Sequence, residues 1–185
     1  LVRAMWVWET KEMLPRPQQI ADLFDFCAQQ QVTELFLQLV YVFDTDALGR
    51  ERAIIIRPEL LNPFIREASS RGIRIHALDG YPDFTLRNQH HKVLSIVQAV
   101  IDYNLEAAPE ERFYGIHLDN EPYQILGFDG PERESILVQF LELNSKVMEL
   151  LKHEKSDMVY GIDIPMWFDE AEIPCVATFN GQTKN

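Results

Sequence analysis

The feature that most constrains the fold is an alternation between two hydrophobic periods along the chain. Continuous apolar runs alternate with segments whose apolar residues recur every three or four positions. Runs rich in Val, Ile and aromatic residues are typical of strands buried on both faces, and the second pattern is typical of amphipathic helices. The expected strands are AMWVW (4–8), ELFLQLVYVF (34–43), IRIHAL (73–78), FYGIHL (113–118) and MVYGIDI (158–164).

Four amphipathic helices are expected between these runs. Pro17 and Pro131 suit the first turn of a helix, and Gly72 suits the position just after a helix end. Strands that alternate with helices predict a single α/β domain over residues 1–185, with a mainly parallel sheet. The helical stripes are Ile20, Leu23, Phe24 and Cys27; Leu61, Phe64, Ile65 and Ala68; Leu94, Val97, Ile101 and Leu105; and Ile136, Leu137, Phe140, Val147 and Leu151.

Two architectures contain such a sheet. A doubly wound nucleotide-binding fold should have a Gly-rich turn after its first strand, but that turn reads WETKEMLPRP and contains no glycine. The strands begin about 38 residues apart on average, so eight units would need roughly 300 residues, which suits a TIM (β/α)8 barrel. The sequence therefore predicts a TIM-type barrel of which this chain covers about the first five βα units.

Charge and hydropathy exclude two classes of partner. The net charge is -12, and no basic stripe is present, so a nucleic-acid partner is not expected. No apolar run reaches the roughly 18 residues of a membrane span. Residues 1–9 are too short for a signal peptide and are interpreted as a strand. Because the chain lacks an initiator Met, the gene is expected to begin upstream, and an extracytoplasmic location with an upstream export signal stays open.

Acidic residues follow every expected strand. Function in a barrel collects at the C-terminal ends of the strands, so acids at all five ends predict one acidic pocket. The acids are Glu9 after the first strand, Asp44 and Asp46 after the second, Asp79 after the third, Asp119 and Glu121 after the fourth, and Asp163 after the fifth, with Trp167 and Asp169 soon after it.

The fourth strand, YGIHLDNEPYQ, has the clearest pattern. A period of two puts His117, Asp119 and Glu121 on one face, whereas Ile116 and Leu118 on the other face should meet the helices. Two carboxylates in a confined site raise the pKa of one of them, and a protonated acid beside an ionised one is the arrangement that glycosidic bond cleavage needs. The alternative is a purely structural role, in which these residues form a hydrogen-bonded polar cluster that fills the barrel.

The segment YGIHLDNE resembles the strand-four signature of the chitinase and endo-N-acetylglucosaminidase family. The resemblance implies that Glu121 is the proton donor and that Asp119 orients the N-acetyl group of the substrate, although His117 stands where that family has an Asp. The triplet Asn120, Glu121 and Pro122 also resembles the Asn-Glu-Pro of clan A glycoside hydrolases, which again implies Glu121 as the acid/base. The wider pattern resembles bacterial glycoside-hydrolase-like barrels that carry no defined substrate.

The leading hypothesis is a glycoside hydrolase that acts on a carbohydrate substrate without a cofactor or metal. Glu121 and Asp119 are the expected catalytic residues. Trp6 and Trp8 share one face of the first strand, where they either fill the barrel or line a sugar site. The expected substrate-binding residues are His117, Asn120, Asp79, Asp163, Tyr123 and Trp167.

The sequence is also consistent with two other functions. One is a metal-dependent barrel enzyme, because histidine together with carboxylates can bind Mn²⁺, Mg²⁺ or Zn²⁺. The other is a non-catalytic barrel that binds a glycan. The metal ligands would come from His117, Asp119, Glu121, Asp79, Asp163 and His76.

Overall fold

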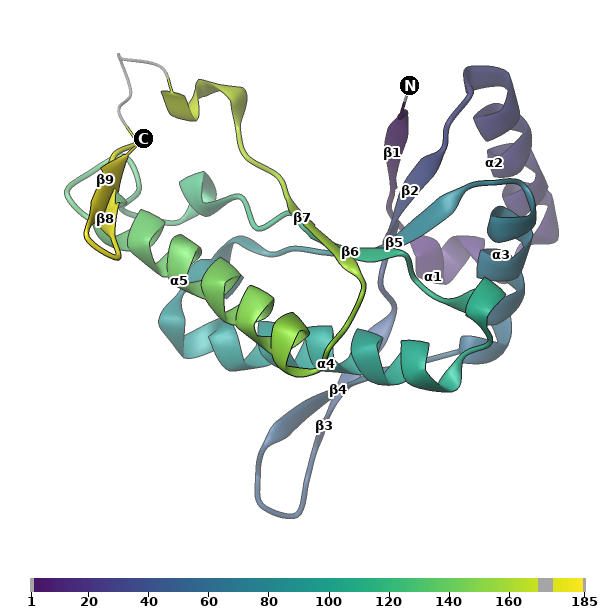
Figure 1. Ribbon diagram of the computed structural model, residues 1–185, viewed down its shortest axis with the longest axis horizontal. Coiled ribbons are helices and arrows are strands. Elements are labelled where there is room, and N and C mark those ends of the chain that lie inside the picture. Colours follow the sequence, from purple (N-terminus) through teal and green to yellow (C-terminus); the bar gives the residue numbers. More distant parts are fainter. Residues whose placement is uncertain (1, 170–174, 185) are drawn as a thin grey trace.

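A computed structural model describes residues 2–169 and 175–184 of the chain. Its centre is a five-stranded parallel sheet whose strand order, β1-β2-β5-β6-β7, follows the chain (Figure 1). The α/β class and the parallel sheet are therefore confirmed. Within the described residues β1 and β7 are the two edges of the sheet, which does not close into a barrel. The strands are β1 Ala4–Val7, β2 Glu34–Gln38, β5 Arg74–Asp79, β6 Gly115–Leu118 and β7 Val159–Ile162.

The four expected helices are present. Pro17 is the first residue of its helix, and Gly72 adopts φ +73° just beyond the end of the next helix, as predicted. The fourth helix begins at Arg133, two residues after Pro131, so Pro131 precedes the helix instead of forming its first turn. The helices are α1 Thr10–Met13, which was not predicted, α2 Pro17–Gln30, α3 Pro58–Ser70, α4 His90–Glu106 and α5 Arg133–His153.

The run expected as one strand over 34–43 is two strands. β2 ends at Gln38, and β3 (Tyr41–Thr45) turns back as an antiparallel hairpin with β4 (Glu51–Ile55). Figure 1 shows this hairpin projecting away from the sheet. The run looked continuous because β3 is apolar on one face too: Tyr41 and Phe43 pack against the main core. A second unpredicted hairpin is formed by β8 (Ala177–Phe179) and β9 (Gln182–Lys184).

The two faces of the parallel sheet differ in their side chains. Ile116 and Leu118 of β6 are buried in one core with residues of α2, α3, α4 and α5, so the predicted helix-facing side is correct. Burying each such side chain contributes about 1.5–3 kcal/mol. The opposite face carries a row of rings, which we call the aromatic face: Trp6, Phe36, His76 and His117.

Two glycines make room for the imidazoles of the aromatic face. A Cβ atom on Gly115 would lie 2.6 Å from Nδ1 of His76, and one on Gly161 would lie 2.8 Å from Nδ1 of His117. Real Cβ atoms do not approach so closely, so any larger residue would displace the ring. His117 lies parallel to Phe36, with ring centres 4.0 Å apart.

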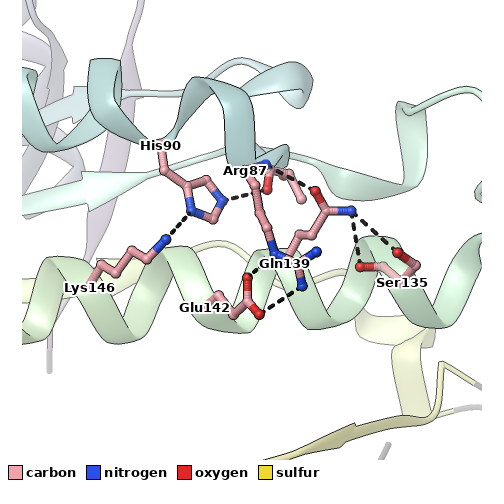
Figure 2. A network of polar contacts seen from close by, with 7 residues as sticks. Arg87, His90, Ser135, Gln139, Glu142 and Lys146 are labelled. Atoms are coloured by element: carbon pink, nitrogen blue, oxygen red, sulfur yellow. Dashed lines mark hydrogen bonds and ion pairs between the residues drawn. The ribbon is translucent and has the colours of Figure 1, made fainter.

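A network of polar contacts joins α4 to α5 (Figure 2). Arg87 donates two hydrogen bonds to Glu142, at 2.6 and 2.8 Å, and its backbone N–H donates to Gln139. His90 is only 2% exposed. Its Nε2 donates to the Thr85 carbonyl at 2.8 Å, and its Nδ1 lies 3.0 Å from the Lys146 ammonium. Burial lowers the pKa of His90, which fits a neutral ring that donates on one side and accepts on the other.

A second, smaller apolar cluster lies beside α5. Its buried residues come from α5, from the segment before it and from the segment around β8. The buried members of this second cluster are Phe128, Ile136, Leu137, Cys175 and Ala177.

None of the helices in the described residues is long and apolar enough to cross a membrane.

Candidate functional site

A small pocket lies just beyond the C-terminal ends of β6 and β7. It has a volume of about 260 Å³, and three of its lining side chains are carboxylates. Among the described residues no lysine or arginine lines it. The parallel sheet explains this concentration of acids, because the carboxyl ends of neighbouring parallel strands meet at one edge. We call this the carboxylate pocket; its lining residues are Trp6, Asp119, Glu121, Tyr123, Asp163, Ile164 and Pro165.

Asp119 is held by the end of the neighbouring strand β5. Its backbone N–H donates to the Asp79 carbonyl at 2.9 Å, which extends the ladder one residue past β6. The chain after β5 passes so close that a Cβ on Gly80 would lie 1.9 Å from the Asp119 carbonyl oxygen. Only glycine allows this approach, so Gly80 fixes the position from which Asp119 enters the pocket.

Glu121 turns out of the strand into the pocket wall. Its backbone is left-handed, with φ 46°, and Pro122 then begins a short 3-10 helix over Pro122–Gln124. Both carboxylate oxygens are occupied: Oε1 accepts from the Tyr123 hydroxyl and Oε2 from the Gln124 amide. The Glu121 carboxylate is therefore held by hydrogen bonds on both of its oxygens.

Asp163 is fixed by two residues of the aromatic face. The indole Nε1 of Trp6 donates to its Oδ2 at 3.2 Å, and Nε2 of His117 lies 3.0 Å from the same oxygen. Because a carboxylate oxygen accepts, both nitrogens act as donors, and the two bonds fix the orientation of the Asp163 side chain. Both bonds fall on Oδ2, and among the described residues Oδ1 has no hydrogen-bond partner.

The electrostatics of the pocket single out Asp119. Burial, followed by repulsion from Asp163 and Glu121, raises the pKa of Asp119 to about 6, while His117 lowers it by a smaller amount. A raised pKa on one carboxyl was expected, but the sequence assigned the acid to Glu121. The structure identifies Asp119 as a carboxyl that is partly protonated at mildly acidic pH.

Asp79 and Asn120 were expected among the substrate-binding residues and do not line the pocket. Asp79 accepts a 3.0 Å hydrogen bond from the Tyr41 hydroxyl and a 2.9 Å bond from the Gly80 N–H. Burial raises the pKa of Asp79. Asn120 is fully buried, and within the described residues its amide atoms find no hydrogen-bond partner. A side chain without exposed surface cannot touch a substrate in this conformation.

Trp167 was expected to offer a stacking face, but it lies in the second apolar cluster. Its ring contacts Tyr123 at 5.4 Å between centres, Phe168 at 5.0 Å and Phe128 at 6.4 Å. The expected residues that do meet at the carboxylate pocket are Asp119, Glu121, Asp163 and Tyr123, with His117 directly behind Asp163.

The expectation that the acids after all five strands share one mouth is wrong: only the acids after β6 and β7 line the carboxylate pocket, and Glu9, Asp44, Asp46 and Asp79 do not. Asp44 belongs to β3, and Asp46 lies in the turn of the β3–β4 hairpin, where it pairs with Arg50 at 2.8 Å. The sequence placed both acids at a strand end because the break between β2 and β3 was not predicted.

Trp6, Ile164 and Pro165 line the pocket but were not among the expected site residues. The sequence did offer a sign for Trp6, because Trp6 and Trp8 share one face of the first strand. That pattern was equally consistent with packing in the core. Ile164 and Pro165 follow β7 directly, and nothing in their composition marks them as pocket residues.

Two further arrangements bear on the other functions. In residues 2–169 and 175–184 no three His, Cys, Asp or Glu side chains converge so as to hold a metal ion, so the metal-dependent alternative has no ligand set there. A larger cavity of about 630 Å³ lies between α5 and the β8–β9 hairpin. Among the described residues its lining is mainly apolar, with Asp169 as the one charged side chain, so these residues offer no paired groups for acid–base chemistry.

Comparison with known protein families, with curated proteins and with solved structures finds no match to this chain. What the protein does therefore rests on the chemistry of its own side chains, and the carboxylate pocket is where that chemistry is concentrated.

Proposed function

We propose that this chain forms the first five βα units of a (β/α)8 barrel that hydrolyses glycosidic bonds in a carbohydrate. Support for the barrel comes from parallel strands arranged in chain order and from helices packed on one face of the sheet. A doubly wound sheet would instead reverse its strand order near the middle. In this proposal the remaining strands complete the barrel between the two edge strands, β7 and β1.

The observation that carries the proposed activity is the carboxylate pocket itself. Asp119, Glu121 and Asp163 line one small space at the C-terminal ends of the strands, where barrel enzymes hold their active sites. The pKa of Asp119 is raised to about 6, and the Asp163 side chain beside it accepts two hydrogen bonds, from Trp6 and His117. Glycoside hydrolysis uses two neighbouring carboxyl groups in different environments, one of which donates a proton.

The roles follow from these environments. The protonated Asp119 carboxyl gives its proton to the glycosidic oxygen as the bond from that oxygen to the anomeric carbon breaks. The Asp163 carboxylate stabilises the positive charge that develops on the sugar ring. Water then adds to the anomeric carbon, and the carboxylate left by the first step takes up its proton. The resemblance to the glycoside hydrolases gives the proton-donor role to Glu121 instead, so both residues must be tested.

The test is an assay of the full-length protein on 4-nitrophenyl glycosides and polysaccharides. Asp119→Asn, Glu121→Gln and Asp163→Asn are compared with Asp25→Asn, which changes an exposed acid on α2. Loss of a general acid lowers the rate roughly 10²–10⁴-fold. The variant that lacks the donor should keep activity on 2,4-dinitrophenyl glycosides, whose leaving group needs no proton. Full activity of all three pocket variants on a cleaved substrate would exclude these carboxylates as catalysts.

A further inference from the structure

Trp6 combines exposure with a fixed orientation. It is 45% exposed, although it belongs to the central sheet. The hydrogen bond from Nε1 to Asp163 holds one edge of the indole. Phe36, at 5.5 Å and 70°, and His117, at 6.5 Å and 80°, contact it edge to face. Since neither ring lies parallel to the indole, neither is stacked on it.

The same contacts join Trp6 to the reactive groups. Asp163 Oδ2 accepts from both Trp6 and His117, so the indole and the carboxylate form one rigid unit. Trp6 also lines the pocket into which Asp119 and Glu121 project. An exposed aromatic side chain next to carboxylates offers a sugar two complementary surfaces. The C–H groups on one side of a pyranose stack on the ring, and its hydroxyl groups donate to the carboxylates.

From this geometry we propose that Trp6 is the residue that binds a sugar ring in the carboxylate pocket. The indole supplies the stacking surface, and Oδ1 of Asp163 accepts a hydroxyl hydrogen of the same ring. The inference rests on the proposed function for the class of ligand, and it gives Trp6 the role that the sequence had assigned to Trp167. His117 acts as a positioning residue, because it reaches the ligand only through Asp163.

The chain contains its own control for this proposal. Trp8 lies one residue beyond the same strand and is also 45% exposed, but it is not among the residues that line the carboxylate pocket. A general effect of surface tryptophans would therefore affect Trp6 and Trp8 alike. If the Trp6 indole is the stacking surface for sugar in the carboxylate pocket, which we call the platform, binding should depend on Trp6 and not on Trp8.

The experiment measures sugar binding separately from sugar cleavage. In the full-length protein, Trp8→Phe and Trp167→Phe together leave Trp6 as the one tryptophan among residues 1–185; any tryptophan beyond them is also replaced by Phe. This variant is titrated with glucose, N-acetylglucosamine, xylose and their tetrasaccharides while its fluorescence is recorded. We expect a saturable change with at least one probe. By calorimetry on the otherwise unaltered protein, Trp6→Ala should weaken that probe about tenfold or more, and Trp8→Ala less than about twofold.

Each outcome decides one of the two proposals. Binding that depends on Trp6, without cleavage of any glycoside, supports the platform and contradicts the hydrolase. Cleavage or binding that is unchanged in Trp6→Ala contradicts the platform and leaves the hydrolase standing. If no probe changes the fluorescence of Trp6, the platform is also wrong. Trp6→Phe keeps an aromatic ring but loses the bond to Asp163, so an intermediate affinity would separate stacking from orientation. Circular dichroism of each variant excludes unfolding as the cause.

Discussion

The carboxylate pocket and the α4–α5 network are both clusters of charged and polar side chains, but they are built on opposite principles. In the network Arg87 faces Glu142, and the pKa of Glu142 is lowered chiefly by its hydrogen bonds from Arg87. In the pocket Asp119 faces two other acids, and no lysine or arginine in the described part of the chain lines the space. Burial and those acids raise the pKa of Asp119.

The difference shows where the protein gives up stability. The network pairs Arg87 with Glu142 and His90 with the Thr85 carbonyl, and it joins two helices, so it favours the folded state. The pocket brings like charges together, so at neutral pH it opposes folding. Groups that are kept despite such a cost are usually functional. Substitutions in the two regions should therefore affect stability with opposite signs.

The largest expected effect is that of Asp119→Asn on activity. Removing the partly protonated carboxyl should lower kcat/KM by roughly 10²–10⁴-fold on any glycoside that the protein cleaves. The same change removes a charge repelled by Asp163 and Glu121, so the melting temperature should stay the same or rise. Both are measured on one preparation, by assay and by thermal unfolding. A clear fall in melting temperature would mean that Asp119 is mainly structural.

The next largest effect should come from His90→Leu in the network. Leucine cannot donate to the Thr85 carbonyl, which is buried together with His90. A buried acceptor left without a partner destabilises by about 1–3 kcal/mol. Urea unfolding measures the change. The neighbouring substitution His91→Leu, on the exposed side of α4, serves as the control and should stay within about 0.5 kcal/mol. Equal effects of the two substitutions would contradict this role for His90.

The pH dependence of stability should differ between the two regions. The pKa of Asp119 rises from 3.8 in the unfolded chain to about 6 in the folded protein. The contribution of Asp119 to the free energy of unfolding is therefore present in full below about pH 4 and is lost as the pH rises through about 6. The loss is at most about 1.4 kcal/mol per pH unit. The stability difference between Asp119→Asn and the unsubstituted protein should grow from pH 4 to pH 6.5 and then level off. A difference independent of pH would show that Asp119 is not buried among acids.

His90 should show the opposite pH dependence. Burial lowers the pKa of His90 from 6.5, so its contribution is present above pH 6.5 and is lost as the pH falls through the lower, folded value. His90→Leu should therefore destabilise the protein more at pH 7.5 than at pH 5. Urea midpoints at the two pH values test this, and a larger effect at pH 5 would contradict it.

The smallest effect is expected for Glu142→Gln. The Arg87 side chain is 56% exposed, and solvent screens exposed ion pairs. The melting temperature should fall slightly at low ionic strength, by less than for His90→Leu, and the difference should disappear in 1 M NaCl as the remaining charge is screened. An effect that survives high salt would mean that the Arg87–Glu142 contact is more than a surface ion pair.

Much of the fold was predictable because the hydrophobic period reports which faces are buried. Ile116 and Leu118 were assigned to the helix side from alternation alone, and both are buried there. The β3–β4 hairpin was missed for the same reason: one of its faces is buried too, so Tyr41 and Phe43 looked like a continuation of β2.

For the site, the sequence could name the acids at the strand ends but not their environments. Asp119 and Asp163 were identified, yet the raised pKa of Asp119 depends on burial and on charges brought together from different strands. The misplacement of Trp167 has a similar cause. Its position just beyond β7 suited a pocket, but its ring packs against the second apolar cluster and is not part of the pocket lining.

The position of Trp6 on β1 has a consequence for assembly. Because β1 is an edge of the described sheet, its outer backbone groups can accept a further parallel strand. A strand added there would lie directly beside the indole and would change its exposure. Thermodynamic linkage makes this effect reciprocal. If the added strand changes the affinity of the pocket for sugar by some factor, sugar changes the affinity of the sheet for that strand by the same factor. If the pocket binds sugar as proposed, sugar would act as an effector of strand association, and the added strand would change the sugar affinity of the pocket.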